Sequence, residues 1–163
     1  ILKGVDGRRM RMVRLLRLVT RPLFRHKSIW LVGERADTAQ DNGYHLFRYL
    51  RESHPDRAVY YVIERESPHV QRVQHLGNVV SHSSLRHRLL MLHAPVLANA
   101  YSIKHMIPRQ WSPDSYTRSV AWRVGAYRVY LKHGVHVSPT AVTRGTGGYD
   151  LYLRVNPKER DAG

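Results

Sequence analysis

The residue best suited to proton transfer in this sequence is a histidine that follows a strand-like run. Residues 127–132 read YRVYLK, a β-branched and aromatic pattern, and His133 and Gly134 come directly after it. An imidazole is partly neutral at cellular pH and can accept a proton from an alcohol. A glycine beside it lets the backbone approach a phosphate. Two interpretations stay open for His133: a working base in a cleft, or a surface residue at a strand exit.

Polar residues also follow two other apolar runs. The strand predicted at 28–33 ends in Gly33 and leads into Glu34 and Arg35, and the strand predicted at 95–100 ends in the letters NA and is followed by YS. In an open parallel sheet, ligands bind beyond the carboxyl ends of the strands. These residues and the histidine are therefore expected at one edge of the sheet.

Strand and helix patterns alternate along most of the chain. Strands are predicted at 28–33, 58–63, 78–81, 95–100, 127–132 and 149–155, and helices at 44–54, 68–77 and 84–93. Residues 101–126 show no clear period. This alternation predicts an α/β fold, a Rossmann-like parallel sheet with helices on both faces.

The polar loop ERADTAQDNG joins the first strand to the first of these helices. Asp41, Asn42 and Gly43 at its end can cap the helix. Alternatively, the free backbone N–H groups of that helix start could hold a phosphate. Arg35 is a further candidate because a guanidinium pairs well with phosphate oxygens.

The composition restricts the classes of function. The chain has 163 residues, 42% of them hydrophobic, no cysteine and a formal net charge of +15. The absence of cysteine excludes disulfides, thiol catalysis and cysteine zinc sites. The charge favours a polyanionic partner, which could be nucleic acid, an anionic membrane or a phosphate-rich substrate. The histidines show no metal-binding spacing.

Residues 8–21 form a basic amphipathic pattern. One set of positions carries Arg11, Arg14, Arg17 and Arg21, and another carries Met12, Leu15, Leu16 and Val19. A helix is predicted here, and Pro22 should end or kink it. Such a helix could lie in an anionic membrane interface, or it could be a packing helix with a solvated arginine face.

Taken together, the blocks GERADTAQDNGYHLFRYL, YYVI, GNVVSHSS and YLKHGV resemble the CDP-glycerol glycerophosphotransferase family, which builds teichoic acid and capsule poly(glycerol phosphate). The resemblance implies the first half of a GT-B fold, so the chain is expected to be a piece of a longer protein. Residues 1–27 would be a membrane-proximal helix or linker, and residues 28–163 the acceptor-side domain without the donor-binding half.

The resemblance also implies a reaction. Glycerol phosphate would pass from CDP-glycerol to a lipid-linked poly(glycerol phosphate) acceptor, and CMP would leave. His133 matches the family's catalytic base, and Lys132 replaces the glutamine of the usual Leu-Gln-His-Gly. Substrate-binding candidates are Gly33, Glu34, Arg35, Asn42 and Gly134.

With a histidine as the base, the implied reaction would require no metal, and no cofactor is expected. The protein is expected at the cytoplasmic face of the membrane, bound peripherally through Arg11, Arg14, Arg17 and Arg21. The alternative is a non-catalytic basic module that binds nucleic acid or anionic membrane. A nucleic-acid partner is disfavoured, since no RNP-like, zinc-finger or helix-turn-helix pattern is present.

Overall fold

A computed structural model gives the fold of the chain. It describes residues 5–116, 120, 124–132 and 149–153. His133 and Gly134, two of the residues expected in the site, lie outside the described residues.

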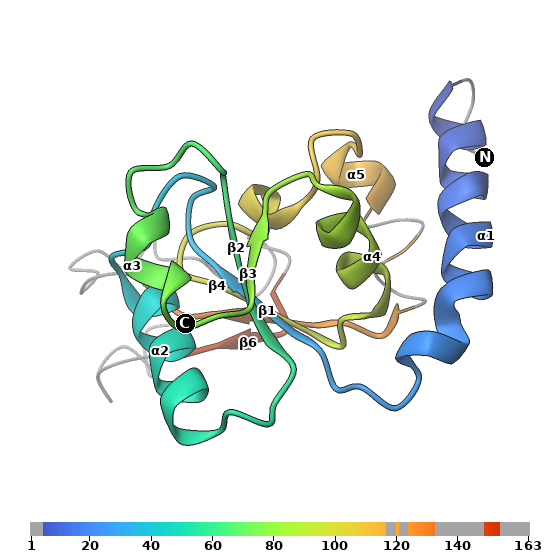
Figure 1. Ribbon diagram of the computed structural model, residues 1–163. Helices are drawn as coiled ribbons and strands as arrows, with labels where there is room; N and C mark the ends of the chain where they lie inside the picture. The colour runs from blue at the N-terminus through green and yellow to red at the C-terminus, as the bar shows by residue number, and fades with distance from the viewer. Residues whose placement is uncertain (1–4, 117–119, 121–123, 133–148, 154–163) are drawn as a thin grey trace.

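The core of the molecule is a parallel sheet of six strands (Figure 1). The strands are β1 (Trp30–Gly33), β2 (Val59–Ile63), β3 (Val79–Ser81), β4 (Val96–Asn99), β5 (Tyr127–Tyr130) and β6 (Leu151–Tyr152). Their order is β3-β2-β1-β4-β5-β6, and every neighbouring pair is parallel. The order reverses between β1 and β4, where open sheets of this kind bind ligands. The predicted fold class is confirmed.

Helices cover the sheet on opposite faces (Figure 1). They are α1 (Val5–Phe24), α2 (Asn42–Ser53), α3 (Val70–Gln74), α4 (Leu85–His93), the 3-10 helix η1 (Ile103–Met106) and α5 (Pro113–Tyr116). α2 and α3 lie on one face, and α4, η1 and α5 on the other. The connections after β1, β2 and β3 are thus the crossovers that a parallel sheet needs.

Two apolar cores follow from the alternation of side chains along the strands. Leu31 of β1 and Leu97 of β4 point into the core under α4. Val32 and Ala98, one position later in each strand, point into the core under α2. Strands buried on both faces read as continuous apolar runs, which explains why residues 58–63 and 95–100 were recognisable in the sequence.

The basic helix packs against α4. The Nε of Arg17 donates to the carbonyl oxygen of Leu92 at 3.1 Å, and the ring of Phe24 stacks on His93 with centroids 4.5 Å apart. The helix continues past Pro22 and ends at Phe24, so the proline lies in the last turn and the predicted stop is two residues early. The division between residues 27 and 28 stays a prediction.

Residues 101–126 contain more structure than the sequence predicted. η1 and α5 lie in this segment, and Ile103, Met106 and Trp111 are buried in the core under α4. A helix of four residues is too short to show a 3.6-residue period, so neither helix was predictable from periodicity.

A histidine of α4, His87, is buried in the apolar core under this helix. His87 has no exposed surface, and its Nδ1 accepts the N–H of Ser83 at 2.9 Å. Burial, followed by the neighbouring His82, lowers the pKa of His87 to about 3. The folded protein therefore holds this imidazole neutral at pH 5 and above.

Acid should destabilise the fold through His87. Below pH 6.5 the unfolded chain binds a proton at this residue and the folded chain does not, so the free energy of unfolding falls by about 2 kcal/mol between pH 7 and pH 5. His87→Gln keeps an acceptor for Ser83 and should remove this part of the slope in urea titrations. His45→Gln, at an exposed position, is the control and should leave the slope unchanged. Equal slopes in His87→Gln and the wild type would contradict the assignment.

Candidate functional site at the carboxyl edge of the sheet

The carboxyl ends of three strands meet at one edge, as the sequence predicted. Gly33 of β1 is in register with Asn99 of β4, and Asn99 is in register with Tyr130 of β5. The ladder continues one residue further, because the N–H of Leu131 donates to the carbonyl oxygen of Asn99 at 2.9 Å. Lys132 thus leaves the sheet at the edge where β1 ends in Gly33.

Glu34 lies directly beneath this edge with its side chain turned inward. It is 1% exposed, and its carboxylate accepts three backbone N–H groups. These come from Gln40 at 3.0 Å, Asp41 at 2.8 Å and Tyr44 at 2.9 Å. The carboxylate thereby holds the loop of residues 35–41 over the end of β1 and caps the first turn of α2. A substrate contact by Glu34 stays a prediction.

The start of α2 touches the end of β1 closely. A Cβ atom at Gly43 would lie 2.7 Å from the carbonyl oxygen of Gly33 and 2.7 Å from Cγ of Glu34. Real Cβ atoms do not approach other atoms so closely, so only glycine fits here without displacement of the helix. Gly43 therefore sets the distance between helix and strand.

The helix start uses its own backbone N–H groups for capping. Asp41 is the N-cap residue, and its Oδ1 accepts the N–H of Asn42 at 2.8 Å. With Tyr44 bonded to Glu34, two N–H groups of the first turn are already satisfied by carboxylates. The capping alternative is therefore the one found, and these two groups are not free to hold a phosphate.

Tyr101, which the sequence places at this edge but which is not among the substrate-binding candidates, contacts two loop residues on the exposed side. The hydroxyl of Tyr101 donates to Oδ2 of Asp41 at 3.2 Å, and the guanidinium of Arg35 lies 4.7 Å above its ring. Burial, followed by the bond to Asp41, raises the pKa of Tyr101, so the hydroxyl stays a neutral donor. The ring thus holds Arg35, an exposed cation, at the edge of the sheet.

Asn99 joins the two central strands at the point where the order reverses. Its Nδ2 donates to the carbonyl oxygen of Glu34 at 2.7 Å, and its Oδ1 accepts the N–H of Tyr101 at 2.7 Å. Asn99 is fully buried, and a buried amide must be hydrogen-bonded. An asparagine at the end of an apolar strand is therefore the sequence signal for such a contact between strand ends.

Asn42, the last of the expected binding residues that the structure describes, connects α2 to β5. Its Nδ2 donates to the carbonyl oxygens of Leu131, at 3.1 Å, and of Lys132. The structure therefore brings Gly33, Glu34, Arg35 and Asn42 to one edge, together with the residue that precedes His133. Among these four, only Arg35 is exposed, and Asn42 is half-buried.

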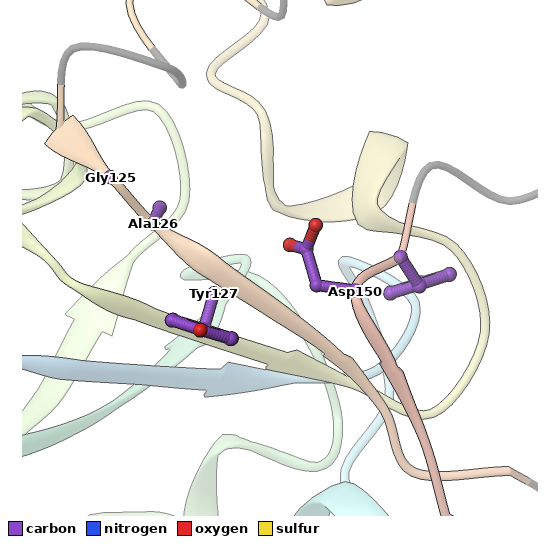
Figure 2. A pocket seen from close by; sticks show the side chains of 5 residues that line it. Gly125, Ala126, Tyr127 and Asp150 are labelled. Atoms are coloured by element: carbon purple, nitrogen blue, oxygen red, sulfur yellow. The ribbon is translucent and has the colours of Figure 1, made fainter.

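The described part of the chain shows no group of three His, Asp or Glu side chains arranged to hold a metal. The surface hollow in Figure 2 lies elsewhere, at the amino end of β5, and is lined by Gly125, Ala126, Tyr127, Tyr149 and Asp150. The carboxylate of Asp150 is paired with Arg128 through two bonds of 3.0 Å. This hollow is therefore at the opposite edge from the candidate site.

Comparison with known proteins gives this edge its context. Residues 13–117 match the family described as CDP-glycerol:poly(glycerophosphate) glycerophosphotransferase. The chain belongs to this family. The matched residues run from α1 through α5 and so include β1, β4 and the first turn of α2.

A curated relative points the same way. The chain is 26% identical over 113 residues to the minor teichoic acid biosynthesis protein GgaB of Bacillus subtilis (strain 168). The alignment covers 69% of this chain and 12% of GgaB, so the chain corresponds to a small part of that protein. No solved structure is significantly similar.

Within this family member, Glu34 should contribute to stability through its three backbone acceptor bonds. Glu34→Ala should lower the free energy of unfolding by about 3 kcal/mol, because three N–H groups lose their partner. Glu34→Gln keeps one oxygen and should lose less. Hydrogen exchange at the N–H groups of Gln40, Asp41 and Tyr44 should be faster in Glu34→Gln than in the wild type, and fastest in Glu34→Ala.

The control for this series is Glu52→Ala, on the exposed side of α2. It should change stability by less than about 0.5 kcal/mol. Equal effects of Glu34→Ala and Glu52→Ala would show that the buried carboxylate does not hold the loop.

Proposed function

We propose that this chain forms the acceptor-side half of a glycerophosphotransferase. The enzyme transfers glycerol phosphate from CDP-glycerol to a terminal glycerol hydroxyl of a teichoic acid or capsule chain. The observation that carries the proposal is the family match over residues 13–117. The parallel sheet supports the proposal. The matched region contains the central strands β1 and β4, and open parallel sheets bind ligands at the carboxyl ends of such strands.

The proposed step is a displacement at phosphorus. The acceptor hydroxyl oxygen forms a bond to the phosphorus that carries glycerol, and the bond from that phosphorus to the bridging oxygen breaks. CMP leaves with the electron pair of that bond. The hydroxyl proton passes to His133, the general base, which accelerates attack by roughly 100- to 10,000-fold.

Arg35 is the proposed contact for a phosphate of the acceptor. It is exposed, it lies over the ring of Tyr101, and its guanidinium matches phosphate geometry. We place CDP-glycerol binding in a separate half of the enzyme, so residues 1–163 alone are proposed to be inactive.

The function is tested with the intact protein, CDP-glycerol and a lipid-linked glycerol-phosphate primer. CMP release should depend on the primer, and His133→Ala should lower kcat by at least about 100-fold. Arg35→Gln should raise the KM for the primer and leave the KM for CDP-glycerol unchanged. His45→Gln is the matched control at an exposed histidine and should leave the rate unchanged.

The outcomes separate the parts of the proposal. Release that is unaffected by His133→Ala would keep the transferase and remove His133 as its base. Wild-type protein that releases no CMP would refute the transferase function.

We also propose that α1 binds the cytoplasmic face of the membrane. Apolar residues of this helix face solvent: Met12, Leu15, Leu16, Leu18, Val19 and Leu23, which we term the apolar stripe. Arg11 and Arg21 are exposed on the same helix, and Arg25 is exposed directly after it. Apolar side chains with arginines beside them suit an anionic bilayer surface.

The docking of α1 on α4 decides which arginines can serve this role. Arg17 is half-buried and bonded to Leu92, and Arg14 is half-buried as well. Arg11 and Arg21 remain exposed, so the proposal rests on them and on the apolar stripe. No helix in the described part of the chain has the length and hydropathy needed to cross a bilayer, so α1 would lie on the surface.

Vesicle sedimentation of the intact protein tests this surface. Binding to phosphatidylglycerol vesicles should exceed binding to phosphatidylcholine vesicles, and Leu15→Glu with Val19→Glu should weaken it more than about tenfold. Tyr49→Glu places a charge at an exposed aromatic residue of α2 and should have no such effect. Equal binding by the stripe variant and the wild type would refute the proposal.

A further inference from the structure

The side-chain amide of Asn42 bonds two peptide groups directly after β5. Its Nδ2 donates to the carbonyl oxygen of Leu131 at 3.1 Å and to the carbonyl oxygen of Lys132. The second of these carbonyls belongs to the peptide bond between Lys132 and His133. One side chain of α2 therefore holds the backbone directly ahead of the proposed base.

The backbone that Asn42 holds has an unusual conformation. Lys132 has a φ of 46°, in the left-handed region that non-glycine residues avoid, and it is 5% exposed. Lys132 lies two positions after the end of β5, and its left-handed φ departs from the extended backbone of the strand. A residue other than glycine needs contacts that stabilise this conformation, and the bonds from Asn42 supply two.

Asn42 is itself fixed in place. It is the first residue of α2, and its own N–H donates to Asp41. The next residue, Gly43, lies against the end of β1, and Glu34 caps the same turn. The donor group is thus attached to a well-determined part of the molecule, which a positioning residue requires.

We propose that Asn42 is a positioning residue for the transfer reaction, acting through the Lys132–His133 peptide. This inference rests on the proposed function and assigns to Asn42 a backbone contact in place of the substrate contact that the sequence suggested. The bonds from Asn42 form a tether: they hold the carbonyl oxygens of Leu131 and Lys132, and through the next peptide bond they would restrict where the proposed base can lie. Proton transfer needs hydrogen-bond distance, so a small displacement has a large effect on the rate.

Asparagine suits this contact for a chemical reason. Both partners are carbonyl oxygens, so the tether needs a side chain with two N–H donors at this length. Aspartate has the same shape but only acceptors, and it would repel both carbonyls. Asn42→Asp is therefore a substitution that keeps the volume and removes the interaction.

The test measures primer-dependent CMP release by the intact protein. Asn42→Asp and Asn42→Ala should each lower kcat by about 100-fold, with the KM values for CDP-glycerol and primer unchanged. Ser84→Ala is the control: Ser84 caps α4 by accepting the N–H of His87 at 3.1 Å, so its removal weakens a helix end away from this edge. It should leave kcat unchanged.

Each result has one meaning. A normal kcat in Asn42→Asp overturns the positioning role and leaves the transferase intact. A raised KM for either substrate with normal kcat also overturns it, because Asn42 would then contact substrate. No CMP release from the wild type refutes the proposed function, and the positioning role with it.

Discussion

The close contact between α2 and the end of β1 is the constraint on which this edge of the molecule depends. Gly43 permits the contact, and the buried carboxylate of Glu34 holds it through three backbone N–H groups. A buried carboxylate is costly unless its oxygens are hydrogen-bonded, so the loop of residues 35–41 has to fold over it. This folded loop brings Asp41 and Asn42 to the neighbouring strands.

At this edge the carboxylates bond to the protein itself, whereas a guanidinium faces solvent. Glu34 and Asp41 use their oxygens on the backbone and on Tyr101, so these carboxylates serve the architecture. Arg35, held over the ring of Tyr101, faces solvent. The pKa of His105 is lowered by burial and, to a smaller extent, by the positive charge of Arg35. The phosphate contact that we propose for Arg35 would therefore be made by a cation that the ring of Tyr101 supports.

The sequence predicted the elements better than it predicted their contacts. Apolar runs revealed the strands because both faces of the sheet are covered, and the parallel arrangement then placed Gly33, Asn99 and Tyr130 at one edge. The bonds that shape the edge join residues far apart in the chain. Asn42 is 89 positions from Leu131, and Arg17 is 75 from Leu92. Local periodicity carries no information on such pairs, so neither bond was predictable.

Lys132 shows how a departure from the family pattern can leave geometry intact. The tether from Asn42 binds backbone carbonyls, so it does not depend on which side chain stands at this position. A left-handed φ costs about 1–2 kcal/mol for any residue with an ordinary Cβ, and lysine and glutamine are equivalent in this respect. The exchange of glutamine for lysine therefore changes the charge at the strand exit and not its path.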